Sequence, residues 1–474
     1  MTTNERSHVE VAAKPALEHE HASLASVTVL GLSAQQLGPG LALCGGYMFV
    51  YAGRASWLCM LIALIAGCTI GATVTVFARR YVASGSLMSY VGRVLGDRSR
   101  TIVGAGYVMG ILIAIAAVVT GVVVYTSSFL ADLGVSFAAE PWVQAVSAVV
   151  VAALAGGLAY RGLDASVKVT LVLTFVGIPV ILFVTGAAVV KSGTAFAGQL
   201  TLSGGGIDLS TIVVGTLVAL SYYVGFEGLA AMAAETKAPL RNVPRLVVLI
   251  LSMTGLPYIV MILLQVPALE GSIDALAEGE SPTTILAHVG NVGFLSGPLD
   301  LILAGATFAG LVATMNYGSR ILATASANGL LPRPLARVHP RFKSPNVAIA
   351  VMTVIGFALP VGLQLTASAP PLVSSSYLYT LFSYFYFIPY VIAAVAAIVL
   401  LVREGRPNLL LATFIGLGGV FFATALIYPL VLPSDGVIGA LPWIMLALTA
   451  LTYAGFVIAR RRHPVEADSL ADAL

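Results

Sequence analysis

Charged residues are scarce in this chain of 474 residues: they make up 9% of the sequence, whereas hydrophobic residues make up 58%. Soluble domains carry about a quarter charged residues, so a soluble core would not hide this much apolar surface. The composition therefore excludes an ordinary soluble protein and indicates that lipid surrounds most of the chain.

Cysteine and histidine are scarce too. Three cysteines, Cys44, Cys59 and Cys68, lie in apolar runs without disulfide or metal-site spacing, so we interpret them as packing residues. The six histidines fall outside the apolar runs, which argues against an enzyme with a histidine cluster at membrane depth. The phosphate-binding pattern G-x-x-x-x-G-K-[ST] is absent, and so is the continuous polar stripe of a channel. We expect no enzyme, no cofactor and no nucleic-acid partner.

Apolar runs of about 20 residues, the length needed to cross a bilayer, recur along the chain. They lie near 27–50, 56–78, 101–130, 142–160, 167–190, 210–233, 246–267, 298–326, 346–366, 376–402, 408–431 and 437–460. They predict an all-α integral membrane protein with about twelve transmembrane helices. Residues 1–25 lack the pattern of a signal peptide and predict a disordered cytosolic tail, and residues 461–474 predict a second cytosolic tail.

The basic residues give the orientation of these helices. With a cytosolic amino terminus, all 24 Lys and Arg fall on the inner side except Arg54 and Lys191. Cytoplasmic loops carry an excess of Lys and Arg, so both termini are expected inside the cell and the membrane is expected to be the plasma membrane. The acidic residues between 270 and 280 then lie outside.

Two helices contain a break in mid-membrane. The first has Gln35-Gln36-Leu37-Gly38-Pro39-Gly40, and the sixth has Tyr222-Tyr223-Val224-Gly225-Phe226-Glu227. Matched breaks in helices five apart, which cross in opposite directions, indicate the binding site of an inverted-repeat transporter. Free N–H groups after Gly40 would suit a carboxylate, and free carbonyls near Gly225 would suit an ammonium group. The alternative at residues 38–40 is a simple packing kink.

The sixth helix and its following loop resemble those of the amino acid–polyamine–organocation (APC) superfamily permeases. The matching residues are Gly225, Phe226, Glu227, Glu235, Lys237, Pro239, Arg241, Val243, Pro244 and Arg245. The eighth helix and its loop are similar to the family's at Arg320, Gly329, Leu330, Pro332, Val338, His339 and Pro345, and a third match runs from Ser84 to Gly96. The resemblance covers helices one to ten, while helices eleven and twelve match only in number and hydropathy.

This resemblance implies a five-plus-five inverted-repeat fold that works by alternating access. The transporter core is expected at 26–402, with repeats at 26–190 and 210–402, and helices eleven and twelve at 403–460. The substrate-binding residues carried over are Gln35, Gln36, Gly38, Pro39, Gly40, Ser221, Tyr222, Val224, Gly225 and Phe226. Because the two breaks offer few charges, we expect a secondary transporter of a neutral amino acid. Pro39 replaces a serine that is common in the family, so an amine or amino alcohol is the alternative substrate.

The coupling ion stays open at the sequence level. Gly177 occupies the place where many proton-coupled members have a lysine, and Lys168 lies too far along the fifth helix to replace it. Glu227 is a candidate proton carrier or else a structural carboxylate, and Thr314 offers a weak sodium site. Resemblance alone favours proton coupling over sodium coupling or exchange. The partners expected are the substrate, a coupling ion and membrane lipid, for a monomer or a homodimer.

Overall fold

The computed structural model describes residues 20–138, 140–193, 196–201, 208–277, 281–367, 371–405, 408–433 and 436–462. Every named element in these ranges is a helix, and the one β feature among them is an isolated bridge between Ala22 and Thr236. The all-α prediction is therefore confirmed. Ten described segments are long and apolar enough to cross a membrane, which defines a multi-pass membrane protein.

The first half of the chain contains two helical pieces followed by five longer or amphipathic helices. They are α1 (Leu24–Ala34), α2 (Leu37–Ala52), α3 (Ser56–Ala78), α4 (Ser86–Leu95), α5 (Asp97–Asp132), α6 (Pro141–Tyr160) and α7 (Leu163–Ser192). A single 3-10 turn, η1 (Gly53–Ala55), separates α2 from α3, so the chain reverses there in very few residues.

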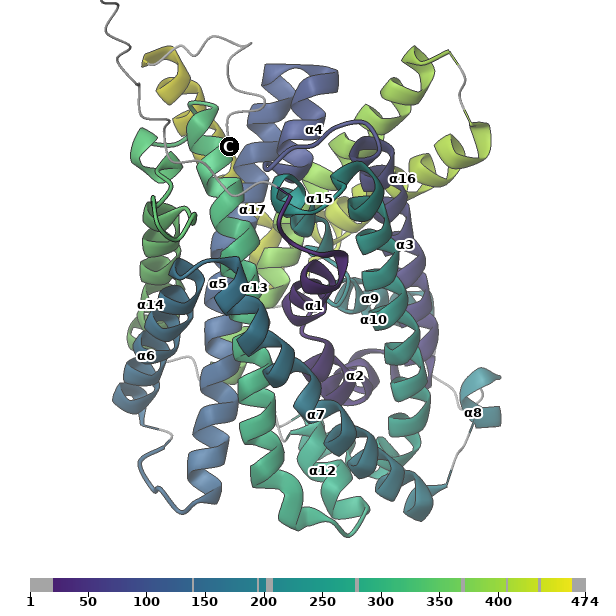
Figure 1. Ribbon diagram of the computed structural model, residues 1–474. Coiled ribbons are helices and arrows are strands. Elements are labelled where there is room, and N and C mark those ends of the chain that lie inside the picture. Colours follow the sequence, from purple (N-terminus) through teal and green to yellow (C-terminus); the bar gives the residue numbers. More distant parts are fainter. Residues whose placement is uncertain are drawn as a thin grey trace, which may run out of the picture.

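The second half begins with a short helix and another interrupted pair. Its elements are α8 (Phe196–Leu200), α9 (Leu209–Leu220), the 3-10 helix η2 (Phe226–Glu235), α10 (Pro239–Leu269), η3 (Glu270–Ser272), α11 (Ile273–Ala277), α12 (Pro282–Val289), η4 (Gly293–Leu295), α13 (Ser296–Ala327), η5 (Arg333–Ala336), α14 (Asn346–Ala367), α15 (Pro371–Arg403), α16 (Leu409–Val431) and α17 (Gly436–Arg462). In Figure 1, α4 lies at the upper end of the molecule and α8 and α12 at the lower end.

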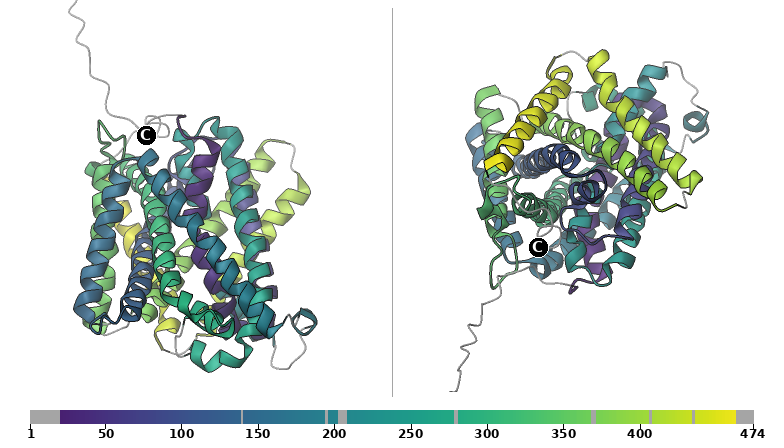
Figure 2. Two further views of the ribbon diagram at one scale, coloured as in Figure 1. Left: turned by 60° about the horizontal axis from the view of Figure 1, so that its bottom comes forward. Right: turned by 90° about the horizontal axis from the view of Figure 1, so that it is seen from above.

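The centre of the bundle is formed by α5, α13 and α15. Small residues let these helices approach: a Cβ added at Gly106 would lie 2.9 Å from the Phe385 carbonyl oxygen, and one at Gly110 would lie 2.5 Å from the Tyr386 ring. Without a hydrophobic drive between helices in lipid, such close packing provides much of their association. By contrast α16 and α17, coloured yellow-green, run along the rim when the molecule is seen from above (Figure 2).

The break in the first helix falls at Gln35 and Gln36. Gln36 adopts a left-handed conformation, with φ 49° and ψ 49°, and α2 begins directly after it at Leu37. Pro39 therefore lies in the first turn of α2, where a missing N–H breaks no helical hydrogen bond. The prediction that the second half-helix starts after Gly40 is wrong, because the Gly40 N–H already donates to the Gln36 carbonyl oxygen at 2.8 Å.

The break in the sixth helix falls where the sequence predicts it. α9 ends at Leu220, a turn follows, and Gly225 has φ +93°, a left-handed conformation that favours glycine. The chain then continues as η2 rather than as an α-helix. The purple α1 and α2 lie at the middle of the bundle, with α9 and α10 beside them (Figure 1).

The segment before α1 is hydrogen-bonded to the end of η2. The Ala22 N–H donates to the Glu235 carbonyl oxygen at 2.8 Å, and the Lys237 N–H donates to the Ala22 carbonyl oxygen at 2.9 Å. A third bond, 3.0 Å long, joins the Glu20 N–H to the Ala234 carbonyl oxygen. Beside them Arg320 of α13 pairs with the Glu235 carboxylate, and both side chains are at most 2% exposed. These contacts close the two broken helices together at one end.

Candidate functional site at the two helix breaks

Glu227 is the carboxylate at the centre of the site, and its residue is fully buried. One carboxylate oxygen, Oε1, accepts a hydrogen bond from the Tyr107 hydroxyl at 3.1 Å. The other, Oε2, accepts from the Tyr390 hydroxyl at 2.6 Å. The Glu227 main-chain carbonyl accepts from the Ser86 hydroxyl at 2.7 Å. Helices α4, α5 and α15 thus hold η2 through one residue, and a buried carboxylate satisfied by hydroxyls is compatible with either role predicted for it.

Tyr390 also satisfies the backbone at the break. Its hydroxyl oxygen accepts a hydrogen bond from the Gly225 N–H at 3.0 Å, and the same hydroxyl donates its hydrogen to the Glu227 carboxylate. The ring packs edge-on against Phe422 of α16, with centroids 4.9 Å apart. Other aromatic residues of α15, such as Phe385 and Phe387, have no exposed surface and are packing residues. Tyr390, by contrast, reaches the break.

The side chain of Gln35 joins the two breaks. With its amide nitrogen directed at the Tyr222 carbonyl oxygen, 3.1 Å away, the amide oxygen accepts the Phe226 N–H at 3.0 Å. In the opposite orientation the amide oxygen would face the Tyr222 carbonyl oxygen and the amide nitrogen would face the Phe226 N–H. The hydrogen-bond partners therefore determine the orientation of the Gln35 amide. The Gln35 carbonyl oxygen accepts from the Tyr258 hydroxyl at 3.2 Å. Next to it, the Gln36 amide donates to the Tyr379 hydroxyl on α15 at 2.7 Å.

Four tyrosines gather beside the breaks, from α2, α5, the α9 end and α15. The phenol group of Tyr125 interacts electrostatically with those of Tyr47 and Tyr379. The phenol group of Tyr222 interacts in the same way with those of Tyr47 and Tyr125. Sequence reasoning missed Tyr47, Tyr125 and also Tyr107. A signal existed on α5, because Tyr107 and Tyr125 are 18 residues apart, which is five helical turns and therefore one face.

The other predicted site residues point in different directions. A Cβ at Gly40 would lie 2.4 Å from the Tyr258 hydroxyl oxygen, so Gly40 faces α10. A Cβ at Gly38 would lie 3.4 Å from Ala306 of α13. Val224 is 4% exposed, and the Ser221 hydroxyl donates to the Val218 carbonyl of its own helix at 2.7 Å. The structure therefore brings together the two glutamines, Tyr222 and residues 225–227.

The coupling candidates of α7 and α13 lie in a tightly packed region. A Cβ at Gly177 would lie 2.5 Å from Ile302 of α13, and the Ser33 hydroxyl is hydrogen-bonded to the Thr174 hydroxyl at 2.6 Å. The Ile302 side chain thus lies against Gly177, where the family resemblance places a lysine. Thr314 is buried, at 2% exposed. The described residues contain no group of three His, Cys, Asp or Glu that would hold a metal ion.

A third buried carboxylate, besides Glu227 and Glu235, was not predicted from the sequence. Asp300, in the second turn of α13, is 2% exposed and accepts from the Ser128 hydroxyl of α5 at 2.5 Å. It falls at the start of the predicted apolar run at 298–326, where an acidic residue is compatible with the end of a membrane helix, so the sequence did not single it out.

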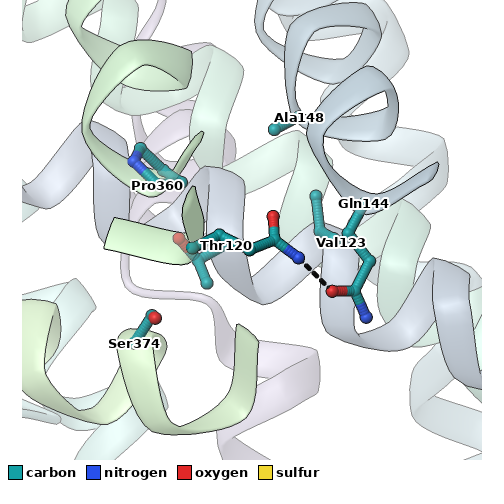
Figure 3. Close-up of a pocket in the computed structure, with 7 residues that line it drawn as sticks. Thr120, Val123, Gln144, Ala148, Pro360 and Ser374 are labelled. Atoms are coloured by element: carbon teal, nitrogen blue, oxygen red, sulfur yellow. Dashed lines mark hydrogen bonds between the residues drawn. The ribbon is translucent and has the colours of Figure 1, made fainter. Parts of the chain in front are cut away.

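A small pocket lies apart from the breaks, between α5, α6, α14 and α15 (Figure 3). Its lining residues are Thr120, Val123, Gln144, Ala148, Pro360, Gln364 and Ser374. Within it the Gln364 side-chain amide nitrogen donates to the side-chain amide oxygen of Gln144, the hydrogen bond drawn dashed in Figure 3. None of the residues predicted for the substrate site lines this pocket.

The breaks, the buried carboxylate and the helical bundle fit a membrane permease, and sequence comparison gives the family. Residues 23–455 match the amino acid permease family, so the chain belongs to that family and thereby to the APC superfamily. The chain is a transporter family member and not an enzyme.

Two relatives from Bacillus subtilis have named substrates. The branched-chain amino acid permease BcaP is 25% identical over 336 residues, which cover 68% of this chain and 70% of the relative. A methylthioribose transporter is 25% identical over 334 residues, which cover 67% and 70%. An uncharacterized transporter of Mycobacterium tuberculosis is more similar in sequence, at 30% identity over 366 residues and 76% of each chain.

Proposed function

We propose that this permease is a secondary active transporter that moves a neutral amino acid across the plasma membrane by alternating access, coupled to protons. The observation that carries the proposal is the meeting of two helix breaks at Gln35 and Gly225 in a member of the amino acid permease family. Apart from the Glu227 carboxylate, which is already paired with two tyrosines, the groups at this meeting point are amides, tyrosine hydroxyls and main-chain dipoles. Such groups suit a ligand with no net charge.

The proposed topology has twelve crossings in a five-plus-five inverted repeat. The segment Leu24–Ala78 is 55 residues long and turns at η1, which supports two crossings, and α9 with η2 supports one more beyond the ten long segments. The proposed repeats are 26–190 and 210–402, followed by helices eleven and twelve at 403–460. The distribution of Lys and Arg supports cytoplasmic termini.

Two free N–H groups support recognition of a carboxylate. Those of Leu37 and Gly38 begin α2 and have no hydrogen-bond partner in the described part of the chain, and Pro39 contributes none. A helix N-terminus with free N–H groups is a favourable place for an anion. The proposed substrate ligands are therefore main-chain groups of α2 together with residues 221–226. An amine or amino alcohol remains the second candidate because Pro39 removes one donor.

Glu227 is the proposed proton carrier, and sodium bound near Thr314 or substrate exchange is the alternative. The experiment is uptake into proteoliposomes of purified protein under separate proton and sodium gradients. We expect uptake of an apolar amino acid that a protonophore abolishes, and we expect Glu227→Gln to lower proton-driven uptake by roughly tenfold or more while exchange persists, since a charged hydrogen-bonded group is lost. Uptake that follows sodium and survives the protonophore contradicts proton coupling.

A further inference from the structure

Three backbone groups at the helix-six break are hydrogen-bonded to the protein's own side chains. The Gly225 N–H donates to the Tyr390 hydroxyl at 3.0 Å, and the Phe226 N–H donates to the Gln35 amide oxygen at 3.0 Å. The Tyr222 carbonyl oxygen accepts from the Gln35 amide nitrogen at 3.1 Å. These are the groups that a broken helix would otherwise offer to a polar ligand.

The helix-one break is satisfied less completely. The Gln36 N–H donates to the Ser33 carbonyl oxygen at 2.8 Å, and the Gln35 carbonyl oxygen accepts from Tyr258. The N–H groups of Leu37 and Gly38 keep no partner within the described residues. The two breaks are thus unequal: two N–H groups suited to a carboxylate are unpaired, whereas the Tyr222 carbonyl, which would suit an ammonium group, is paired with Gln35.

We propose that Gln35 is a specificity-determining residue whose amide nitrogen occupies the ammonium position on the Tyr222 carbonyl until the substrate displaces it. The inference rests on the proposed function, because it takes the substrate to be a zwitterionic amino acid. The amide oxygen keeps the Phe226 N–H satisfied in both states, so that only one hydrogen bond is exchanged. A ligand without an amino group leaves the bond between Gln35 and Tyr222 in place.

This exchange makes the affinity for amino groups depend on Gln35. In Gln35→Met, which keeps the length of the side chain, the Tyr222 carbonyl has no partner in the empty protein. The substrate ammonium then gains a hydrogen bond without breaking one, and a net hydrogen bond changes affinity by about three- to tenfold. A residue that only supported the fold would weaken every ligand alike when replaced.

The test compares three ligands of one shape on purified full-length protein: leucine, isopentylamine without the carboxylate, and 4-methylpentanoate without the amino group. We expect Gln35→Met to bind leucine about three- to tenfold more tightly than wild type and to bind 4-methylpentanoate equally. The matched control is Gln364→Met, which removes a half-buried amide from the separate pocket of Figure 3 and is expected to change none of the three affinities.

Gln35→Glu provides a second variant. Its carboxylate still accepts the Phe226 N–H, yet it attracts a cation and repels a substrate carboxylate, so we expect preference to shift from leucine toward isopentylamine. Weaker leucine binding in Gln35→Met, an equal change for all three ligands, or an unshifted preference in Gln35→Glu overturns the proposal. A wild type that binds no amino acid in a panel of apolar side chains overturns the proposed function itself.

Discussion

Among single residues, Tyr390 and Tyr386 allow a matched comparison on one helix. Both are buried on α15, but the Tyr390 hydroxyl is hydrogen-bonded to the Gly225 N–H and the Glu227 carboxylate. The Tyr386 hydroxyl has no hydrogen-bond partner among the described residues. Leaving a buried polar group unpaired costs about 1–3 kcal/mol. We expect Tyr390→Phe to lower the free energy of unfolding by about that amount and Tyr386→Phe to leave it equal or higher. Thermal unfolding in detergent measures both, and equal losses would contradict the assignment.

The pair of Arg320 and Glu235 gives a second prediction at this scale. Both groups are almost completely buried, so removing one partner leaves an unpaired charge away from water. Breaking such a pair costs about 3–5 kcal/mol, while replacing both partners is often much less harmful. We expect Arg320→Met and Glu235→Gln each to lower the unfolding temperature strongly and the double variant to recover part of the loss. A double variant as unstable as the sum of the two singles would argue against direct pairing.

The sequence predicted these residues unevenly. Glu227 and the glycine at 225 stand out in an apolar helix, so their environment is evident from the chain itself. The partners Tyr107 and Tyr390 come from helices 120 and 163 residues away in sequence, and no local pattern links them to Glu227. The amide of Gln35 is a similar case, because its two bonds depend on how the breaks face each other.

For helical elements, the glycines at the breaks set the geometry. Gly225 has φ +93°, and a Cβ there would lie 3.3 Å from the Phe382 ring, so a side chain adds strain as well as crowding. A non-glycine residue in such a conformation costs about 1–3 kcal/mol. We expect Gly225→Leu and Gly40→Leu to abolish uptake, the second through collision with Tyr258. Gly157 of α6 has open space around it, so Gly157→Leu is the control expected to transport normally.

Insertion is measured separately in these variants by membrane fractionation, so that loss of uptake is not mistaken for loss of protein. Normal uptake by Gly225→Leu would show that the sixth-helix break lies outside the transport path. The position of the breaks was predictable because glycine and proline interrupt helices. The start of α2 was not, since Pro39 is tolerated inside the first helical turn, where sequence reasoning placed a gap.

On the scale of the whole molecule, orientation is open to a direct test. The basic residues predict that the loop containing Arg333 faces the cytosol, together with the loops at 79–100 and 234–246. We expect a cysteine introduced as Arg333→Cys to resist membrane-impermeant thiol reagents in intact cells and to react after permeabilisation. Since the native cysteines Cys44 and Cys59 are buried, they add little background. Labelling of Arg333→Cys in intact cells would reverse the proposed orientation.

The all-helical architecture and the family were predictable from apolar length and motif, and both are confirmed. Packing between helices was not predictable in the same way. A Cβ on Gly177 would collide with Ile302 of α13, so a neighbouring helix lies directly beside the position at which the family resemblance places a lysine. The pattern of apolar residues indicates which segments lie in the membrane, but it does not determine how two buried helix faces pack against each other.

The main-chain bonds between residues 20–22 and 234–237 bear on the kinetics of the transport cycle. They join the start of one broken helix to the end of the other, and the buried Arg320–Glu235 pair lies at the same place. Parting the two helices at this end would break these contacts together, because both segments are short and successive hydrogen bonds involve the same or adjacent residues. Opening would therefore be a cooperative event with a large activation enthalpy, so that turnover should rise steeply with temperature when this step limits the rate.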